Sequence, residues 1–262
     1  LSDHILVAAS GPVATVTLNR PEQRNAISYQ MWLDLGEIAA RLGADRSVRC
    51  VVFRGAGDQA FSAGADIKDF PEHRHDSRSA ARYAEASEGA MDRVERMPQP
   101  TISMVRGYCV GGGLELATCT DIRVAALGSK FGVPVSRISV VAGYREVQRI
   151  ARLAGPAAAA YLLHSGRLIG HEEAVRCGLV MLAVPPEKLE EETYALAGEI
   201  ARGAPLSHSA HKLILRKVQD DPGLSTLKDS DRALQFEVFD SSDFREGTAA
   251  FREKRPPKFT GS

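Results

Sequence analysis

The sequence predicts an α/β domain followed by a helical C-terminal segment. Over residues 1–200, short apolar runs of the kind that form buried strands alternate with amphipathic stretches that have helical spacing. This alternation implies parallel strands joined by crossover helices. Residues 201–262 contain helix-like sequence instead. With 262 residues, the chain is long enough for one large domain with such an appendage.

The first elements follow in order from the N-terminus. Residues 13–18 (VATVTL) alternate in character, which predicts a strand, and the turn after them contains Pro21. Apolar side chains then recur at helical spacing over residues 28–42, which predicts an amphipathic helix. The continuous apolar run of residues 50–53 predicts a buried strand, and we expect residues 55–65 to form a loop.

The next stretch, residues 73–82, is polar and charged, and we expect it to be exposed or mobile. Helical spacing over residues 83–97 predicts a second helix, which Pro98 would end, and strands are expected over residues 101–105 and 121–125. In the second half we expect a short strand over residues 180–184 and helices over residues 155–164, 171–177, 187–202, 205–219 and 227–239.

A glycine-rich turn links the strand over residues 101–105 to a helix-like run over residues 114–119. Residues 107–115 (GYCVGGGLE) contain three consecutive glycines, which permit unusual dihedral angles and let a ligand approach the backbone closely. The helix that follows directs free N–H groups at this turn. Glu115 lies three residues after Gly112, so both face the same side. A backbone that stabilises an anion beside a carboxylate indicates an enzyme that forms an enolate.

A second loop, residues 60–70 (AFSAGADIKDF), follows the strand over residues 50–53, where a parallel α/β fold places binding residues. Gly64 permits a tight turn that would leave the N–H of Ala65 free to donate. The N–H groups of Ala65 and Gly112 would then meet on one oxygen and form an oxyanion hole. Lys68 lies just beyond, where it suits a phosphate or polyphosphate group.

Four stretches, spread in order over nearly the whole chain, resemble signatures of the crotonase superfamily, also called the enoyl-CoA hydratase/isomerase superfamily. They are RPEQRNAIS, AFSAGADIKDF, GYCVGGGLELATCTDI and SDFREGTAAFREKRPPKF. The resemblance implies a spiral of ββα turns that carries the acyl-CoA site in residues 1–200, and a helical trimerisation segment in residues 201–262. It also implies a homotrimer, or a hexamer built from two trimers.

The resemblance assigns roles by position. Ala65 and Gly112 match the two N–H donors to a thioester carbonyl, and Glu115 matches a catalytic glutamate. Phe239 and Lys254 match C-terminal groups that lie near the coenzyme A of a neighbouring subunit. No cofactor is expected beyond the coenzyme A of the substrate. Contacts to substrate or coenzyme A are expected from Arg24, Ala63, Lys68, Gly111, Val135, Arg145, Phe239 and Lys254.

The sequence departs from the hydratases of this superfamily at one catalytic position. Their second glutamate belongs in a segment like F-G-x-P-E, and here the segment is FGVPV, which ends at Val135. Downstream, Tyr144, Arg145 and Glu146 replace three small residues. Hydration removes a proton from water and delivers one to the α-carbon, and Val135 does neither.

Three hypotheses stay open at this point. The first is a hydratase or isomerase of an atypical enoyl-CoA, with Glu115 as acid and base and Glu146 or Tyr144 as the second group. The second is an acyl-CoA decarboxylase, in which Arg145 or Tyr144 orients a carboxylate. The third is an acyl-CoA-binding homologue without catalysis.

Composition argues against several other classes. The formal net charge is zero and the basic residues are dispersed, so we expect neither nucleic-acid binding nor electrostatic recruitment to a membrane. No apolar run is long enough to span a bilayer, and the N-terminus lacks the pattern of a signal peptide. The four cysteines are widely spaced, which favours free thiols in a cytoplasmic protein, and the scattered histidines predict no metal site.

Overall fold

The computed structural model describes residues 3–262, in which ten strands form two sheets. The six-stranded sheet has the order β1-β2-β3-β5-β7-β10 and the four-stranded sheet the order β4-β6-β8-β9. The strands of the large sheet are β1 (Ile5–Ser10), β2 (Val13–Leu18), β3 (Cys50–Gly55), β5 (Thr101–Val105), β7 (Ile122–Ala126) and β10 (Leu182–Val184). Those of the small sheet are β4 (Ala60–Ser62), β6 (Tyr108–Val110), β8 (Lys130–Gly132) and β9 (Ile169–Gly170).

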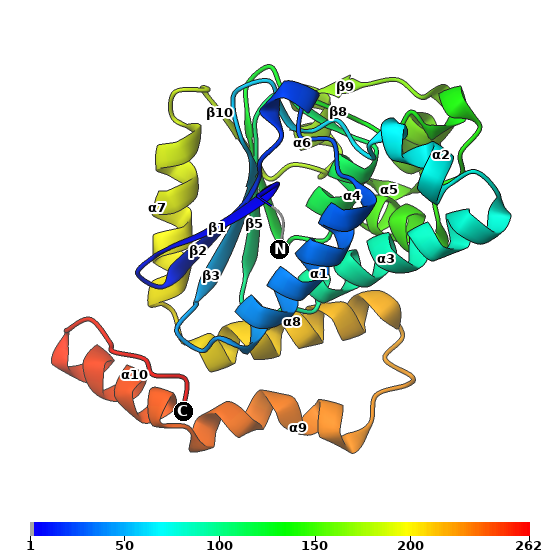
Figure 1. Cartoon of the computed structure of the whole chain (residues 1–262). Coiled ribbons are helices and arrows are strands. Elements are labelled where there is room, and N and C mark those ends of the chain that lie inside the picture. Colours follow the sequence, from blue (N-terminus) through cyan, green and yellow to red (C-terminus); the bar gives the residue numbers. More distant parts are fainter. Residues whose placement is uncertain (1–2) are drawn as a thin grey trace.

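Ten α-helices accompany the sheets within the described residues (Figure 1). They are α1 (Tyr29–Ala44), α2 (Phe70–His73), α3 (Ser77–Glu95), α4 (Gly112–Thr118), α5 (Tyr144–Ser165), α6 (His171–Arg176), α7 (Leu189–Arg202), α8 (Pro205–Asp220), α9 (Asp229–Glu237) and α10 (Ser242–Glu253). None of the helices in residues 3–262 has both the length and the apolar content to cross a membrane.

The chain repeats one unit, in which a strand of the large sheet is followed by a strand of the small sheet and then by a helix. The runs β3–β4–α3, β5–β6–α4 and β7–β8–α5 are three such units, apart from short helical turns between some of their elements. Strands β2, β3, β5, β7 and β10 pair in parallel, as the crossover helices require, while β1 and β2 form an antiparallel hairpin. The predicted α/β fold built from ββα turns is therefore confirmed.

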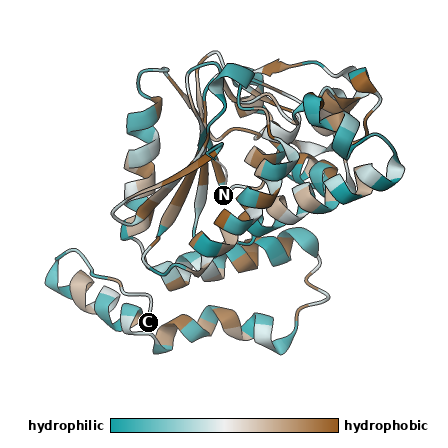
Figure 2. Ribbon diagram, in the orientation of Figure 1, coloured by the Kyte–Doolittle hydropathy of each residue, from teal (hydrophilic) through white to brown (hydrophobic). Residues whose placement is uncertain are grey.

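Two hydrophobic cores lie on opposite faces of the large sheet. Side chains alternate between these faces along a strand, so Val51 and Phe53 enter one core while Cys50 and Val52 enter the other. Helix α7 covers the second face, and α1 and α3 pack against each other on the first (Figure 1). In Figure 2 the hydrophobic colour follows the strands between these helices, as expected for a sheet that is buried on both faces.

Several elements differ from the sequence-based expectations. The loop expected over residues 55–65 contains β4, and β6 lies between β5 and the glycine turn. Helix α3 begins at Ser77, inside the stretch predicted to be exposed or mobile, because the side chain of Asp76 accepts a hydrogen bond from the Ser79 N–H (2.7 Å) and caps the helix. The sequence analysis also missed β1, β8, β9 and α10, and the first half of α5, which bends at Gly155 (φ +82°).

Candidate active site

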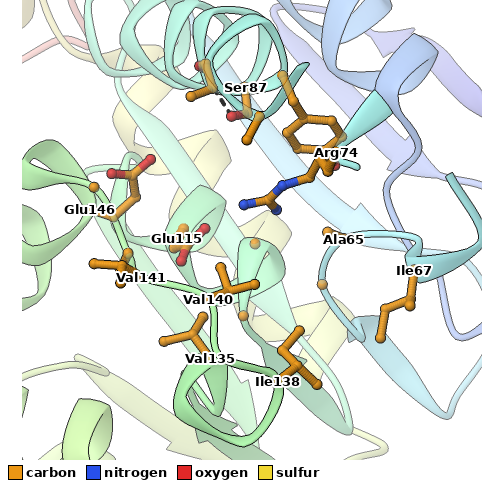
Figure 3. Close-up of a pocket in the computed structure, with 18 of the residues that line it drawn as sticks. Ala65, Ile67, Arg74, Ser87, Glu115, Val135, Ile138, Val140, Val141 and Glu146 are labelled. Atoms are coloured by element: carbon orange, nitrogen blue, oxygen red, sulfur yellow. Dashed lines mark hydrogen bonds between the residues drawn. The ribbon is translucent and has the colours of Figure 1, made fainter. Parts of the chain in front are cut away.

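A cavity of about 450 Å³ lies where the carboxyl ends of the small-sheet strands meet α3, α4 and the start of α5 (Figure 3). Its walls come from residues far apart in the sequence. The loop after β4 contributes Ala63, Gly64 and Ala65, and the turn after β6 contributes Gly111 and Gly112. The two glycine loops singled out by the sequence therefore meet at one cavity.

The backbones of these two loops approach so closely that Gly64 has no room for a side chain. Gly64 has φ +100°, and a Cβ there would lie 2.8 Å from the oxygen of Val110 and 3.2 Å from the nitrogen of Gly112. A Cβ on Gly112 would in turn lie 3.5 Å from the nitrogen of Ala65. Glycine is needed at position 64 both for the left-handed backbone and for this contact.

Two backbone N–H groups are left without a partner in secondary structure. Ala65 forms a parallel bridge with Ile27, which uses the oxygen of Gly64 (2.8 Å) and the N–H of Asp66 (2.9 Å). In a parallel bridge these flanking groups make the hydrogen bonds, so the N–H of Ala65 is directed away from Ile27. Gly112 is the first residue of α4, and its N–H has no acceptor within the helix.

Glu115 lies one helical turn after Gly112 on α4, and a Cβ on Gly112 would be 3.8 Å from Oε2 of Glu115. Burial raises the pKa of Glu115 to about 7, and the negative charge of Glu146 acts in the same direction. Arg74 and Arg149 act in the opposite direction. A carboxyl group with this pKa exchanges a proton readily near neutral pH, which suits an acid and base.

A second carboxylate enters the cavity from the first turn of α5. Glu146 is only 6% exposed, and its Oε2 accepts no hydrogen bond from any described residue. A Cβ on Gly143 would collide with this oxygen and lie 2.9 Å from Oε1 of Glu88. Burial, followed by the charge of Glu146, raises the pKa of Glu88. Glu88, Glu115 and Glu146 thus form a group of three carboxyl side chains at the cavity.

Arg149, one turn further along α5, holds this end of the helix in place. Its guanidinium is buried and pairs with Asp92 (2.5 Å) and Glu95 (2.7 Å) of α3. Glu95 also pairs with Arg152 (2.7 Å). The ion pairs join α5 to α3, and this connection positions Glu146 over the cavity.

Arg74 is one of several cavity residues that the sequence analysis missed. Arg74 follows α2, and its guanidinium lies 4.8 Å from the ring centre of Phe70 and 4.7 Å from that of Tyr83. Figure 3 shows the guanidinium pointing into the cavity, toward Glu115. Arg74 lies in the polar stretch predicted to be exposed or mobile, so the sequence analysis did not place it at a cavity.

Comparisons with known proteins agree over the whole chain. The family model described as "Enoyl-CoA hydratase/isomerase" matches residues 8–262. The chain is 34% identical to a crotonyl-CoA hydratase of Syntrophomonas wolfei, with 98% of each chain covered. It belongs to the enoyl-CoA hydratase/isomerase family. It is also 36% identical to an (E)-benzylidenesuccinyl-CoA hydratase of Thauera aromatica, covering 98% of this chain and 99% of that protein.

A solved structure of an enoyl-CoA hydratase/carnithine racemase from Magnetospirillum magneticum superposes with a TM-score of 0.96. The two are 43% identical, and the match covers 100% of this chain and 97% of that one. The fold is therefore the crotonase fold, and the chain is an acyl-CoA enzyme of this family.

Within this family fold, Val135 lies in the cavity wall, where the sequence comparison placed a second glutamate. Val135, Ile138, Val140 and Val141 form an apolar side of the cavity (Figure 3). Glu146 brings a carboxylate to the same cavity from the first turn of α5, a later element of the chain.

Two other candidates from the sequence lie outside the cavity. Tyr144 is 98% exposed. Arg145 donates from Nη1 to Oε1 of Gln148 (3.3 Å) on the surface of α5. Neither is among the residues that line the cavity, so the structure separates both from Glu115 and Gly112.

Of the residues expected to contact substrate or coenzyme A, Ala63, Gly111 and Val135 line the cavity, whereas Arg24, Lys68, Phe239 and Lys254 do not. The oxygen of Arg24 accepts from the N–H of Ala63 (2.9 Å), which places Arg24 next to the cavity loop. Lys68 directly follows Ile67, which lines the cavity. Phe239 and Lys254 belong to the exposed C-terminal helical segment. Across residues 3–262, no three His, Cys, Asp or Glu side chains are arranged to hold a metal ion.

Proposed function

We propose that this family member hydrates or isomerises an atypical enoyl-CoA, with Glu115 and Glu146 as its two catalytic carboxylates. The observation that carries this proposal is the meeting of both side chains in one cavity, beside the backbone of Ala65 and Gly112. Glu146 would supply the function that Val135 cannot. Of the two substitutes considered from the sequence, only Glu146 faces the cavity.

The backbone groups would stabilise the intermediate. Addition of water to an enoyl thioester places negative charge on the thioester oxygen as the enolate forms. The N–H groups of Ala65 and Gly112 would donate to this oxygen, and each such donor contributes about 3 kcal/mol to the stabilisation of a transition state.

The two carboxyl groups would divide the proton transfers. One carboxylate accepts a proton from water as the oxygen bonds to the β-carbon, and the other, protonated, gives its proton to the α-carbon of the enolate. Because burial and the charge of Glu146 raise the pKa of Glu115 to about 7, Glu115 can both hold and release a proton near neutral pH, as the reaction requires of an acid and base.

Straight, branched and cyclic enoyl-CoA thioesters test the proposal. We expect at least one to be hydrated or isomerised, with a rate that falls by about 10²- to 10⁴-fold in Glu115→Ala and in Glu146→Ala. A wild-type rate no higher than that of Glu115→Ala on every thioester would contradict it. Tyr144→Ala is the matched control and should keep the wild-type rate.

The two other hypotheses predict different outcomes. A decarboxylase releases CO₂ from malonyl-type thioesters, but Tyr144 and Arg145, the groups considered for that role, lie outside the cavity. A non-catalytic homologue binds coenzyme A esters and forms no product. Product analysis on enoyl-CoA and malonyl-type thioesters distinguishes hydration from decarboxylation, and calorimetry with the same compounds detects binding without product.

Coenzyme A binding and assembly belong to the same proposal. Arg24 and Lys68, next to cavity residues, would bind the phosphates of coenzyme A. Phe239 and Lys254 would complete the site of a neighbouring subunit in a homotrimer or in a hexamer of two trimers. The exposed aromatic side chains of the C-terminal segment support this assembly. The free thiols of all four cysteines support a reducing, cytoplasmic setting.

A further inference from the structure

We propose that Arg74 binds a carboxylate carried by the acyl group of the substrate, so that the enzyme prefers the mono-thioester of an unsaturated dicarboxylic acid. This inference rests on the proposed function, because it names the class of enoyl-CoA that enters the cavity.

The guanidinium of Arg74 forms no ion pair within 4.0 Å of any acidic side chain among residues 3–262, although its charge lowers the pKa of Glu115. The buried arginines all have partners: Arg20 pairs with Asp66 (2.8 Å) and Arg149 with Asp92 and Glu95. Arg123 donates to the carbonyl oxygens of Leu179 and Thr120. Arg74, although half-buried, forms no ion pair or side-chain hydrogen bond with any residue of 3–262. Its planar donors match a carboxylate in a bidentate arrangement.

Aromatic rings hold the guanidinium in position. It lies over the faces of Phe70 and Tyr83, and the hydroxyl of Tyr83 accepts a hydrogen bond from Nε1 of Trp32 (3.0 Å) in the core. Because these contacts use the ring faces, the N–H donors stay available at the cavity. An arginine fixed in this way loses little side-chain entropy when an anion binds.

The charges around the cavity favour a substrate whose acyl group places a carboxylate next to Arg74. Glu88, Glu115 and Glu146 line the cavity and would repel a carboxylate elsewhere in it. The only other arginine of the lining, Arg137, is exposed, and its side chain lies against Gly166, 3.3 Å from a Cβ placed there. Arg74 is therefore the cation that points into the interior (Figure 3).

The remaining wall suits a hydrocarbon body. Val135, Ile138, Val140 and Val141 form an apolar surface in the same cavity. A fatty enoyl chain would use this surface and leave Arg74 without a partner. An acyl group with an apolar body and one carboxylate would contact the apolar wall and also pair with Arg74.

Two enoyl-CoA thioesters of equal length, one ending in a methyl group and the other in a carboxylate, test the inference. We expect the wild type to show a higher kcat/KM for the carboxylated one. In Arg74→Gln the ratio of the two kcat/KM values should fall by about 10- to 100-fold, with partial recovery in Arg74→Lys. The matched control, Arg137→Gln, should keep the wild-type ratio. A wild type that prefers the methyl compound, or an Arg74→Gln variant with an unchanged ratio, would overturn the inference.

A binding measurement separates this inference from the proposed function. Calorimetry with the two saturated acyl-CoA analogues needs no turnover, and Arg74→Gln should weaken only the carboxylated one. If this preference is found without hydration of any enoyl-CoA, the proposed function fails but carboxylate binding by Arg74 stands. If hydration is found without a carboxylate preference, only the inference about Arg74 fails.

Discussion

At the scale of single residues, the pKa of Glu115 depends on its burial and on charged neighbours with opposite effects, of which Glu146 and Arg74 line the cavity. The carboxylate of Glu146 raises the pKa of Glu115, and the guanidinium of Arg74 lowers it. The sequence predicted Glu115 and Glu146 as candidates, since both positions could be compared with the family. It did not predict Arg74, because nothing local to a polar stretch shows that its side chain turns inward over two rings.

We predict that substitutions of these two neighbours shift the titration of Glu115 in opposite directions. Glu146→Gln removes a negative charge, so the pKa of Glu115 should fall below about 7, while Arg74→Gln removes a positive charge and should raise it. NMR of carboxyl-labelled protein measures both shifts without turnover. The inflection of kcat/KM against pH should move in the same directions. Shifts of equal sign would contradict the described electrostatics.

Glu115 is also predicted to lower the free energy of unfolding above neutral pH. Its pKa is raised from 4.5 to about 7, so the folded chain binds this proton more tightly than the unfolded chain, and stability falls as pH rises through this interval. Glu115→Gln should therefore raise the Tm by at least about 2 °C at about pH 8 and lose this advantage at about pH 5. Thermal unfolding at both pH values measures it, and an equal change at both would contradict the prediction.

At the scale of elements, the close approach of the two glycine loops makes the site. We predict that Gly64→Ala lowers kcat/KM by about 10- to 100-fold, because its Cβ would meet the oxygen of Val110 and the nitrogen of Gly112 and displace one N–H donor. Gly128→Ala is the matched control. Gly128 also has a left-handed backbone (φ +88°), but a Cβ there meets nothing within 4 Å.

The outcome of this pair separates strain from geometry. Both variants should lose stability through the strained backbone, but only Gly64→Ala should lose activity on folded protein. If Gly64→Ala and Gly128→Ala lose kcat/KM to a similar extent, the loss of activity does not come from the close approach of Gly64 to Gly112.

Elements with a clear apolar pattern were predicted from the sequence, whereas most of the very short strands were not. Strand β2 was predicted from its alternation, helix α1 from its helical spacing, and β3 from a continuous apolar run. The small-sheet strands β4, β6 and β8 have three residues each, which is too short for a period, and tertiary pairing alone defines them. The helix predicted from Gly155 begins where the backbone of α5 is non-helical (φ +82°) and two helical segments meet at a kink; the segment before this kink, residues 144–154, was missed.

At the scale of the whole molecule, the last three helices have little core of their own. Within residues 201–262, Asp243 and Ala210 are among the few buried side chains, while Phe236, Phe239 and Phe251 are exposed. Helices α9 and α10 lie beyond α8, away from the sheets, in Figure 1. Helices over residues 205–219 and 227–239 were predicted from their sequence pattern. Among residues 3–262, the side chains of Phe236, Phe239 and Phe251 stay exposed, and the proposed oligomer would cover them.

We predict that the chain assembles through this segment. The wild type should have three or six times the monomer mass of 28.3 kDa in light scattering, and Phe239→Asp/Phe251→Asp should shift it toward the monomer, because charges would replace buried aromatic contacts. Met181→Asp, at an exposed apolar side chain outside the C-terminal segment, is the control and should keep the wild-type mass. If Phe239 and Lys254 complete a neighbour's coenzyme A site, the dissociated variant should also show a larger rise in KM than fall in kcat. A wild type that is monomeric at micromolar concentration, or a double variant of unchanged mass, would contradict the assembly.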